Sequence, residues 1–286
     1  MTTRYLVVGA GGMLGHDLMA ALRGRDVTAA TRADLDVTDA DAVSRAVAGH
    51  DVVINASAFT AVDAAESNED GAFAVNAVGP ANLARAAAEH GAVLVQVSTD
   101  YVFDGRATTP YAEDAPTHPV SAYGRTKAAG ERLAQEHNPG ATLILRTAWL
   151  YGASGGNFVK TMARLAGERE TLTVVDDQIG QPTWSVDLAQ RIVDLLDTGT
   201  RSGIFHATNA GQTSWCGFAR AIFSGLGLDP ARVQPISSDQ FVAPAPRPAW
   251  SVLGHEGWAT TGLPPMRPWE DALADALDAG VAAARA

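Results

Sequence analysis

The sequence is poor in cysteine, in basic charge and in long hydrophobic runs. Cys216 is the only cysteine in 286 residues, so an internal disulfide framework is impossible and a reducing compartment is expected. Lysine and arginine total 21 against 32 acidic residues, a formal net charge of -11. No basic stretch could neutralise phosphates, so neither nucleic acid nor an anionic membrane is an expected partner. Apolar runs fall short of the roughly 20 residues that cross a bilayer, and no secretory leader is apparent; we expect a cytoplasmic protein.

The first 150 residues alternate between short β-rich runs and alanine-rich helical patterns. Strands of this kind that alternate with helices indicate βαβ units and a parallel sheet covered on both faces. We therefore predict an α/β fold with a doubly wound parallel sheet of the Rossmann type. The predicted strands are residues 5–8, 27–31, 52–55, 93–98 and 142–146, and the predicted helices are residues 15–22, 39–48, 80–90 and 123–137.

The second half of the chain has a less regular sequence pattern. Glycine-rich, irregular polar and proline-rich segments (152–157, 174–183 and 244–248) separate isolated helical patterns. We predict an NAD(P)-binding Rossmann domain in residues 1–150. Residues 151–286 are predicted to form mainly a smaller, intercalated substrate-binding lobe, with some segments returning to the Rossmann domain. The helical patterns cover residues 157–166, 186–196, 215–224 and 269–277.

A glycine-rich turn follows the first predicted strand, in the run Gly9-Ala10-Gly11-Gly12-Met13-Leu14-Gly15. Glycines here permit a tight turn, close approach of the backbone to a pyrophosphate and close packing of helix on strand. The free N–H groups at the start of the next helix can then bind the anion. A plain glycine turn is the structural alternative. The position directly after the first buried strand favours a dinucleotide site that includes Gly9, Gly11 and Gly12.

The residues after the second strand bear on the choice of cofactor. A carboxylate there would bind the ribose hydroxyls, whereas an arginine can accommodate a 2′-phosphate. The strand ends at Thr31-Arg32, and the next acids are Asp34 and Asp36. Arg32 therefore favours NADPH, with NADH as the alternative; a solvated surface arginine is the other interpretation of this residue.

A second chemical signal is the run Tyr123-Gly124-Arg125-Thr126-Lys127. Tyrosine and lysine at positions i and i+4 share one helix face. An ammonium beside a phenol is expected to lower the pKa of Tyr123, which could then donate a proton to a carbonyl oxygen. Upstream, Thr99 ends a strand at the edge of the sheet that faces the ligand crevice. A solvated helix face is the alternative for the Tyr–Lys spacing, but the glycine turn and Thr99 together favour catalysis.

The chain resembles the dTDP-4-dehydrorhamnose reductase family of extended short-chain dehydrogenases/reductases. The resemblance runs from residue 5 to about residue 253. The most family-specific match is the run Thr99-Asp100-Tyr101-Val102-Phe103-Asp104-Gly105. The other matching segments are residues 9–15, 55–66, 123–127, 146–151, 157–158 and 177–183.

The resemblance implies roles for individual residues. Thr99 would hydrogen-bond the substrate 4-keto oxygen, Tyr123 would be the general acid, and Lys127 would orient the nicotinamide ribose. Substrate contacts would come from Asp100, Trp149 and Arg247, the last by pairing a phosphate; a charged loop residue is the alternative for Arg247. Cofactor contacts would come from Gly12, Met13, Leu14, Asp36, Val37, Ser57, Ala58, Phe59, Tyr123 and Lys127.

Three positions bear on specificity, metal and assembly. Trp250 stands where family members often carry Asn, and residues 253–258 lack the usual basic ending, so the sugar and nucleotide specificity is left open. Some relatives hold magnesium at a dimer interface, and Asp17 matches one such position. An exposed helix acid is the alternative for Asp17. We assign no metal and leave a homodimer open.

The implied activity is NAD(P)H-dependent reduction of the 4-keto group of dTDP-4-dehydro-L-rhamnose to dTDP-L-rhamnose. One alternative keeps the reaction but changes the sugar, as in 4-ketoreductases of secondary metabolism. Another is a non-catalytic regulatory subunit like the beta subunit of methionine adenosyltransferase. An epimerase is a third, since it would use the same three residues. The presence of Thr99, Tyr123 and Lys127 favours an enzyme.

Overall fold

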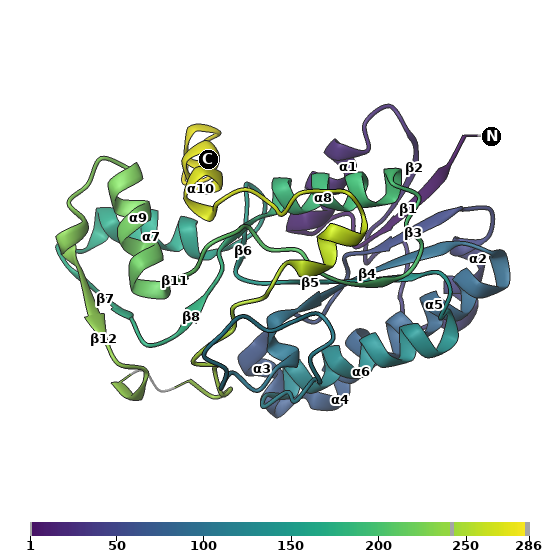
Figure 1. Cartoon of the computed structure of the whole chain (residues 1–286), viewed down its shortest axis with the longest axis horizontal. Coiled ribbons are helices and arrows are strands. Elements are labelled where there is room, and N and C mark those ends of the chain that lie inside the picture. The colour runs from purple at the N-terminus through teal and green to yellow at the C-terminus, as the bar shows by residue number, and fades with distance from the viewer. Residues whose placement is uncertain (1, 241–242, 284–286) are drawn as a thin grey trace.

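Six parallel strands form a central sheet in the computed structural model, which describes residues 2–240 and 243–283 (Figure 1). Their order across the sheet is β10-β5-β4-β3-β1-β2. All except β10 lie where the sequence predicts a strand. The strands are β1 (Arg4–Val8), β2 (Asp26–Ala30), β3 (Val52–Asn55), β4 (Val93–Thr99), β5 (Thr142–Thr147) and β10 (Gly203–His206).

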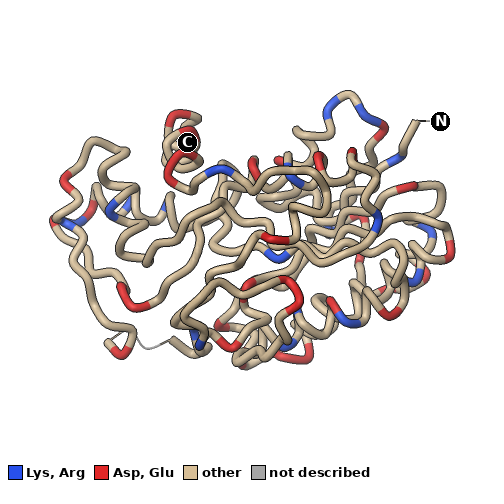
Figure 2. The backbone as a smooth tube through the Cα atoms, in the orientation of Figure 1, with Lys and Arg blue, Asp and Glu red and all other residues tan. Residues whose placement is uncertain are grey.

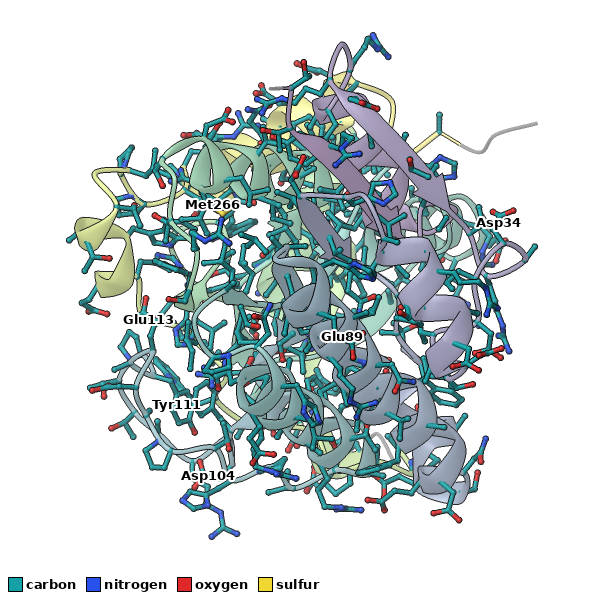
Figure 3. All side chains as sticks on the ribbon, turned by 90° about the vertical axis from the view of Figure 1, so that its right-hand side faces the viewer. Asp34, Glu89, Asp104, Tyr111, Glu113 and Met266 are labelled. Carbon is teal, nitrogen blue, oxygen red and sulfur yellow. The ribbon has the colours of Figure 1, made fainter. Side chains whose placement is uncertain are left out.

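Side chains that alternate along these strands build one core on each face of the sheet. On one face, Tyr5 and Val7 belong to a core that includes α1 (Met13–Ala21) and α8 (Ser185–Asp197). Met266 joins this core from the C-terminal part of the chain (Figure 3). On the other face, Leu6 and Val8 belong to a core shared with three further helices. These helices are α2 (Ala40–Val47), α5 (Gly79–His90) and α6 (Ala122–His137). The doubly wound α/β fold is confirmed.

A third core lies in a second lobe, on the left of Figure 1. Three helices, α7 (Phe158–Glu168), α9 (Trp215–Gly225) and α10 (Trp269–Asp278), contribute to it, and their aromatic residues fill much of it. Three two-stranded pairs complete the lobe: β6 (Leu150–Tyr151) with β9 (Thr183–Trp184), β7 (Leu172–Val175) with β12 (Val233–Ile236), and β8 (Ile179–Gly180) with β11 (Thr213–Ser214).

The chain passes between the sheet and the second lobe more than once. After β9 it forms α8 on the sheet, then β10 at the sheet edge, and only then β11 and α9 of the second lobe. The remaining short elements are α3 (Val62–Ser67), α4 (Glu69–Phe73), the π-helix η1 (Ala74–Val78), and the 3-10 helices η2 (Asp100–Val102), η3 (Pro230–Arg232), η4 (Ser238–Gln240) and η5 (Glu256–Thr260).

Acidic and basic residues are interspersed along both parts of the molecule (Figure 2). Within residues 2–240 and 243–283, no helix is long and apolar enough to span a bilayer.

The direction of winding changes between β1 and β3. The chain leaves β1 for β2 on one side of the sheet, and it builds β3, β4 and β5 on the other. In open sheets of this kind, ligands bind in the crevice outside the carboxyl ends of the strands at this point. That edge carries the turn at Gly9, Asn55 at the end of β3, and the paired residues Thr99 and Thr147 at the ends of β4 and β5.

Candidate active site

The turn after β1 depends on glycine at two positions. Gly9 has φ +82°, and a Cβ there would lie 2.7 Å from the backbone N of Ser57. A Cβ at Gly15 would lie 2.2 Å from the carbonyl oxygen of Gly9. Both contacts are with backbone, which cannot move aside easily, so helix α1 and the loop after β3 approach the turn as closely as glycine allows. Gly11 and Gly12 are exposed, and helix α1 begins at half-buried Met13 with no side-chain cap on Gly12. The N–H groups of this helix start are open to an anion.

The loop after β3 is held by two buried amides. Asn55 Oδ1 accepts hydrogen bonds from Ser57 N and Oγ, at 3.1 and 2.6 Å. Asn76, in the π-helix η1, accepts from Phe59 N at 2.8 Å and donates to Phe59 O at 3.1 Å. It also donates to Thr126 Oγ1 on α6 at 3.1 Å. Asn76 therefore ties the predicted cofactor residues Ser57, Ala58 and Phe59 to the helix that carries Tyr123 and Lys127.

Sequence reasoning missed Asn76. Its only sequence signal is an amide among small apolar residues at 74–79, which is equally typical of a solvated helix position.

After β2, two carboxylates are engaged in hydrogen bonds, whereas a nearby arginine is exposed. Asp34 accepts from Thr31 N and Oγ1, and Asp36 accepts from Thr38 N and Oγ1. These hydrogen bonds lower the pKa of both carboxyls. Val37 is buried, and its Cγ2 would meet a Cβ at Gly79 at 2.7 Å. Arg32 is exposed and, among the residues described, makes no hydrogen bond or ion pair. Arg32 is thus available to an anion, whereas the carboxylates of Asp34 and Asp36 already accept hydrogen bonds from Thr31 and Thr38.

Thr99, Tyr123 and Lys127 meet at the carboxyl end of β4. Helix α6 starts at the cap Ser121, whose Oγ accepts from Gly124 N at 3.1 Å. Lys127 is 4% exposed, and its Nζ donates to the carbonyl oxygen of Val97 at 2.6 Å. One turn earlier, Tyr123 lies beside the Thr99 hydroxyl and meets Tyr101 edge-on, with ring centroids 5.6 Å apart. The structure therefore brings together the three residues predicted to be catalytic.

The expected effect of Lys127 on Tyr123 was wrong. The pKa of Tyr123 is raised to about 12, chiefly by burial; the Thr99 hydroxyl lowers it and the charge of Asp100 adds to the rise within that value. The Lys127 ammonium donates to the carbonyl oxygen of Val97 instead of acting on the phenol, so the predicted lowering does not occur. Burial lowers the pKa of Lys127 itself to about 8, against the opposing charge of Glu131. At neutral pH Tyr123 thus keeps its proton.

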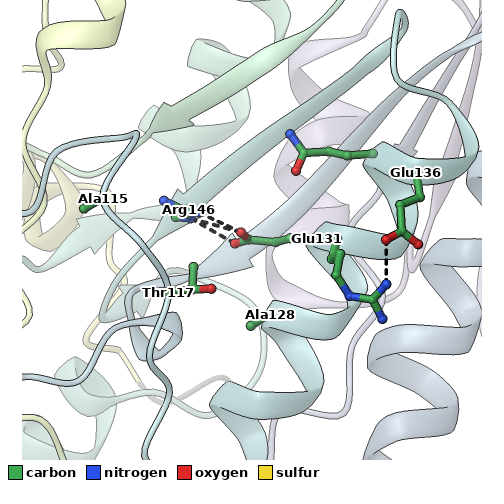
Figure 4. Close-up of a pocket in the computed structure, with 8 residues that line it drawn as sticks. Ala115, Thr117, Ala128, Glu131, Glu136 and Arg146 are labelled. Carbon is green, nitrogen blue, oxygen red and sulfur yellow. Dashed lines mark hydrogen bonds and ion pairs between the residues drawn. The ribbon is translucent and has the colours of Figure 1, made fainter.

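Four residues after Lys127, α6 is fixed by a buried ion pair. Arg146 of β5 donates from Nη2 to Glu131 Oε2 at 2.8 Å, and the two side chains are 3% and 5% exposed. Arg146 and Glu131 also line a surface hollow of about 460 Å³ (Figure 4). The hollow contains none of the predicted site residues and lies outside the crevice. We assign the ion pair to the support of α6.

Asp100 is almost fully buried next to Thr99. The Thr99 hydroxyl donates to Asp100 Oδ1 at 2.9 Å, whereas Oδ2 is buried without a hydrogen-bond partner among the described atoms. Burial raises the pKa of Asp100 to about 6, and polar contacts, first among them Ser251, oppose the rise. An acceptor without a partner at the edge of the crevice suits a ligand hydroxyl.

Arg247 comes to the same region from the far end of the chain. Its Nη2 lies 2.9 and 3.0 Å from the two carboxylate oxygens of Asp63, on α3. Its Nη1 is buried without a hydrogen-bond partner among the described atoms. The charges of Asp63, Asp100, Tyr123 and Arg247 all act on Tyr101, which places Arg247 near the catalytic cluster.

Trp149 lies two residues beyond Thr147 on the chain, at the base of the second lobe. It is half-buried, has φ +46°, and stacks on Trp215 with ring centroids 3.6 Å apart. Positive φ is rare for a bulky aromatic residue, so the surrounding contacts must hold this backbone conformation.

Asp17 is engaged within the fold. Its Oδ2 accepts from Ser185 Oγ at 2.5 Å, which joins α1 to the start of α8. Within the described part of the chain, no three His, Cys, Asp or Glu side chains group as metal ligands would.

The two departures from the family pattern have structural roles. Trp250 donates from its backbone N to Gly105 O at 3.1 Å and from Nε1 to Thr109 O at 3.1 Å. In the segment 253–258, Gly254 and Gly257 donate to Tyr111 O and Glu113 Oε1, at 2.7 and 3.0 Å. Trp258 is fully buried in the core of the sheet. These residues anchor the loop that carries Asp104, Tyr111 and Glu113 (Figure 3).

Comparison with known proteins identifies relatives over nearly the whole chain. A dTDP-4-dehydrorhamnose reductase of Streptomyces griseus is 51% identical, covering 96% of this chain and 93% of the relative. A dTDP-4-keto-6-deoxy-D-glucose reductase of Streptomyces niveus is 50% identical, covering 97% of each. A dTDP-4-dehydrorhamnose reductase of Bacillus anthracis, solved in complex with NADP, superposes with a TM-score of 0.94 and 38% identity, covering 98% of this chain and all of that one. The family model described as the RmlD substrate binding domain matches residues 3–281, and the chain belongs to that family.

Proposed function

We propose that the protein reduces the 4-keto group of dTDP-4-dehydro-L-rhamnose, with NADPH, to give dTDP-L-rhamnose. The observation that carries this proposal is the meeting of Thr99, Tyr123 and Lys127 at the crevice of a chain 51% identical to a reductase of that name. The alternative of a regulatory subunit gives no reason for a protonated tyrosine beside a strand-end hydroxyl.

The residues present fit a nicotinamide dinucleotide. The start of α1, with Met13 and Leu14, offers free N–H groups to a pyrophosphate. Gly9, Gly11 and Gly12 let the backbone approach it, and a Cβ at Gly9 or Gly15 would disturb the turn. When bound, the cofactor supplies a hydride to the sugar. Lys127 would orient its ribose. The loop residues Ser57, Ala58 and Phe59 would line its path, with Asp36 and Val37 at the adenine.

Arg32 is our reason for proposing NADPH over NADH. It is exposed, while Asp34 and Asp36 are engaged with Thr31 and Thr38. A 2′-phosphate would therefore meet a guanidinium, with the neighbouring carboxylates occupied. The Bacillus anthracis relative, which was solved with NADP, supports this choice.

Tyr123 acts as a general acid in this proposal. Because its pKa is about 12, the phenol holds its proton at neutral pH. It transfers that proton to the substrate C4 oxygen as negative charge develops there. Thr99 would donate a hydrogen bond to the same oxygen once its hydroxyl turns from Asp100 Oδ1, to which it donates in the free protein. This hydrogen bond would stabilise the developing charge.

The substrate would be held at three further points. Asp100 Oδ2 is a buried acceptor with no described partner and suits a sugar hydroxyl. Trp149 would pack against the sugar nucleotide. Arg247, with Nη1 buried and unpaired among the described atoms, would donate to the diphosphate.

A second candidate keeps the mechanism and changes the sugar. The Streptomyces niveus relative, 50% identical, is named for a 4-keto-6-deoxy-D-glucose substrate. The catalytic trio is compatible with either sugar, so the product must decide between them. Net consumption of the reduced cofactor separates both candidates from an epimerase.

The test is to follow the absorbance of NADPH, and separately of NADH, with enzymatically prepared dTDP-4-dehydro-L-rhamnose. We expect rapid oxidation of NADPH and dTDP-L-rhamnose as the product, identified by NMR. Oxidation only with a different dTDP-4-keto sugar would replace the substrate assignment. Cofactor binding without oxidation of any such sugar would contradict the reductase proposal.

A further inference from the structure

The backbone of Trp149 is held in a conformation that tryptophan rarely adopts. Its φ of +46° is the one positive value at a non-glycine residue within the part of the chain that the structure describes. Such a conformation costs free energy and persists only where the surroundings enforce it. Trp149 also stands at a junction, because it follows β5 of the catalytic sheet and precedes β6 of the second lobe.

Two residues of the second lobe fix the Trp149 ring. Trp215, the first residue of α9, stacks on it with centroids 3.6 Å apart and planes inclined by 10°. On another side, a Cβ added to Gly180 would lie 2.5 Å from Cε2 and 2.6 Å from Cζ2 of the indole. Any side chain at position 180 would therefore push the ring away.

The pairing of β8 with β11 positions both Gly180 and Trp215. Gly180 ends β8, which pairs with β11 so that Thr213 lies opposite Gly180 and Ser214 lies opposite Ile179. Ser214 also caps α9, accepting from Gly217 N at 2.9 Å, and its hydroxyl donates to Asp176 Oδ1 at 2.5 Å. The helix cap and the strand pairing at Ser214 therefore fix the orientation of the next residue, Trp215.

We infer that Trp215 is a positioning residue that holds Trp149 in place for the sugar nucleotide, with Gly180 providing the space for the ring. The inference rests on the proposed function. In this inference, the pairing of β8 with β11 places the Trp149 side of the substrate site next to the edge of the sheet that carries Thr99. Trp215 itself need not touch the substrate.

The experiment compares Trp215→Leu, Trp215→Phe and Gly180→Ala with the wild-type protein. Circular dichroism detects the exciton couplet of two stacked indoles, and calorimetry measures the Kd of dTDP-L-rhamnose. We expect Trp215→Leu and Gly180→Ala to weaken the couplet and raise this Kd by about three- to tenfold, the range expected for one aromatic pair. The Kd of NADPH should be unchanged, and Trp215→Phe, which can still stack, should retain most of the sugar-nucleotide affinity.

Phe158→Leu is the matched control. The Phe158 ring also contacts Trp215, with ring centroids 4.6 Å apart and planes inclined by 55°. Shortening Phe158 therefore perturbs the packing of the lobe but leaves the Trp149–Trp215 pair intact. An equal loss of affinity in Phe158→Leu, or a lost couplet with unchanged affinity, would overturn the inference. If Trp215→Leu does not fold, Gly180→Ala decides by the same two readouts. If the wild type binds dTDP-L-rhamnose but does not reduce dTDP-4-dehydro-L-rhamnose, the proposed function is refuted. The role of Trp215 in binding can still be tested by the same variants.

Discussion

Lys127 Nζ donates to the carbonyl oxygen of Val97 across 2.6 Å, so one turn of α6 is fixed to the end of β4. Thr99 lies two residues after Val97 on the strand, and Tyr123 lies one turn before Lys127 on the helix. Together with the buried Arg146–Glu131 ion pair, this contact holds the Tyr123 phenol against the Thr99 hydroxyl before any ligand arrives. Preorganised donors of this kind need little rearrangement as charge develops.

Replacing Asp100 by Asn should change how stability depends on pH. The ordinary pKa of 3.8 rises to about 6 in the folded protein, so the native state holds a proton that the unfolded chain releases between these values. The contribution of Asp100 to stability must therefore fall as pH rises through this window, by up to about 3 kcal/mol. Buried His206, whose pKa is lowered to about 3, acts in the opposite direction, so the wild type is compared with Asp100→Asn: the free energy of unfolding of the wild type relative to the variant should fall between pH values of about 4 and 7, measured by urea unfolding. Asp26→Asn, at an exposed acid, should behave as the wild type; a difference between wild type and Asp100→Asn that does not change with pH would count against the buried carboxyl.

Arg32→Ala should weaken the preference for NADPH. The loss of a charge-assisted contact to the 2′-phosphate should raise the KM for NADPH about tenfold and leave that for NADH within about twofold. Steady-state kinetics with both cofactors provide the measurement. Arg23→Ala, another exposed arginine near α1, is the control. Equal effects on the two cofactors would show that Arg32 does not contact the 2′-phosphate.

Arg247→Ala should weaken binding of the sugar nucleotide and leave cofactor binding unchanged. Because Nη1 is buried with no described partner, a diphosphate would find a donor already in place. We expect the KM for the sugar nucleotide to rise about tenfold or more, as for one charge-assisted hydrogen bond, with the KM for NADPH unchanged. Arg132→Ala, an exposed arginine on α6, should affect neither constant. A parallel rise in both KM values would instead indicate a general disturbance of the loop paired with Asp63.

The sequence revealed the parts of the site that depend on local spacing. The glycine turn and the i, i+4 pair of Tyr123 and Lys127 lie within short segments, so the helix and turn geometry follows directly. The Asp63–Arg247 pair joins residues 184 positions apart, and no local pattern connects them. The same holds for Asn76, whose role appears only when η1 lies between the Phe59 loop and α6.

Other features could not be predicted because tertiary contacts decide them. The run that forms β10 is four residues long and gains its partner only when the chain returns to β5. The pKa of Tyr123 was predicted in the wrong direction because helical spacing gives the shared face but not the atom to which Lys127 donates. Fold class and family could thus be predicted from the sequence, whereas the charges within the crevice required the structure.

The most direct measurement is the turnover of Tyr123→Phe with NADPH and dTDP-4-dehydro-L-rhamnose. Removing a general acid should lower kcat at least about 100-fold, while the Kd of NADPH stays within about twofold of the wild type. Tyr111→Phe, which removes a phenol bonded to Asp104, is the control and should keep its rate. A near-normal kcat in Tyr123→Phe would contradict the assignment of Tyr123 as the proton donor.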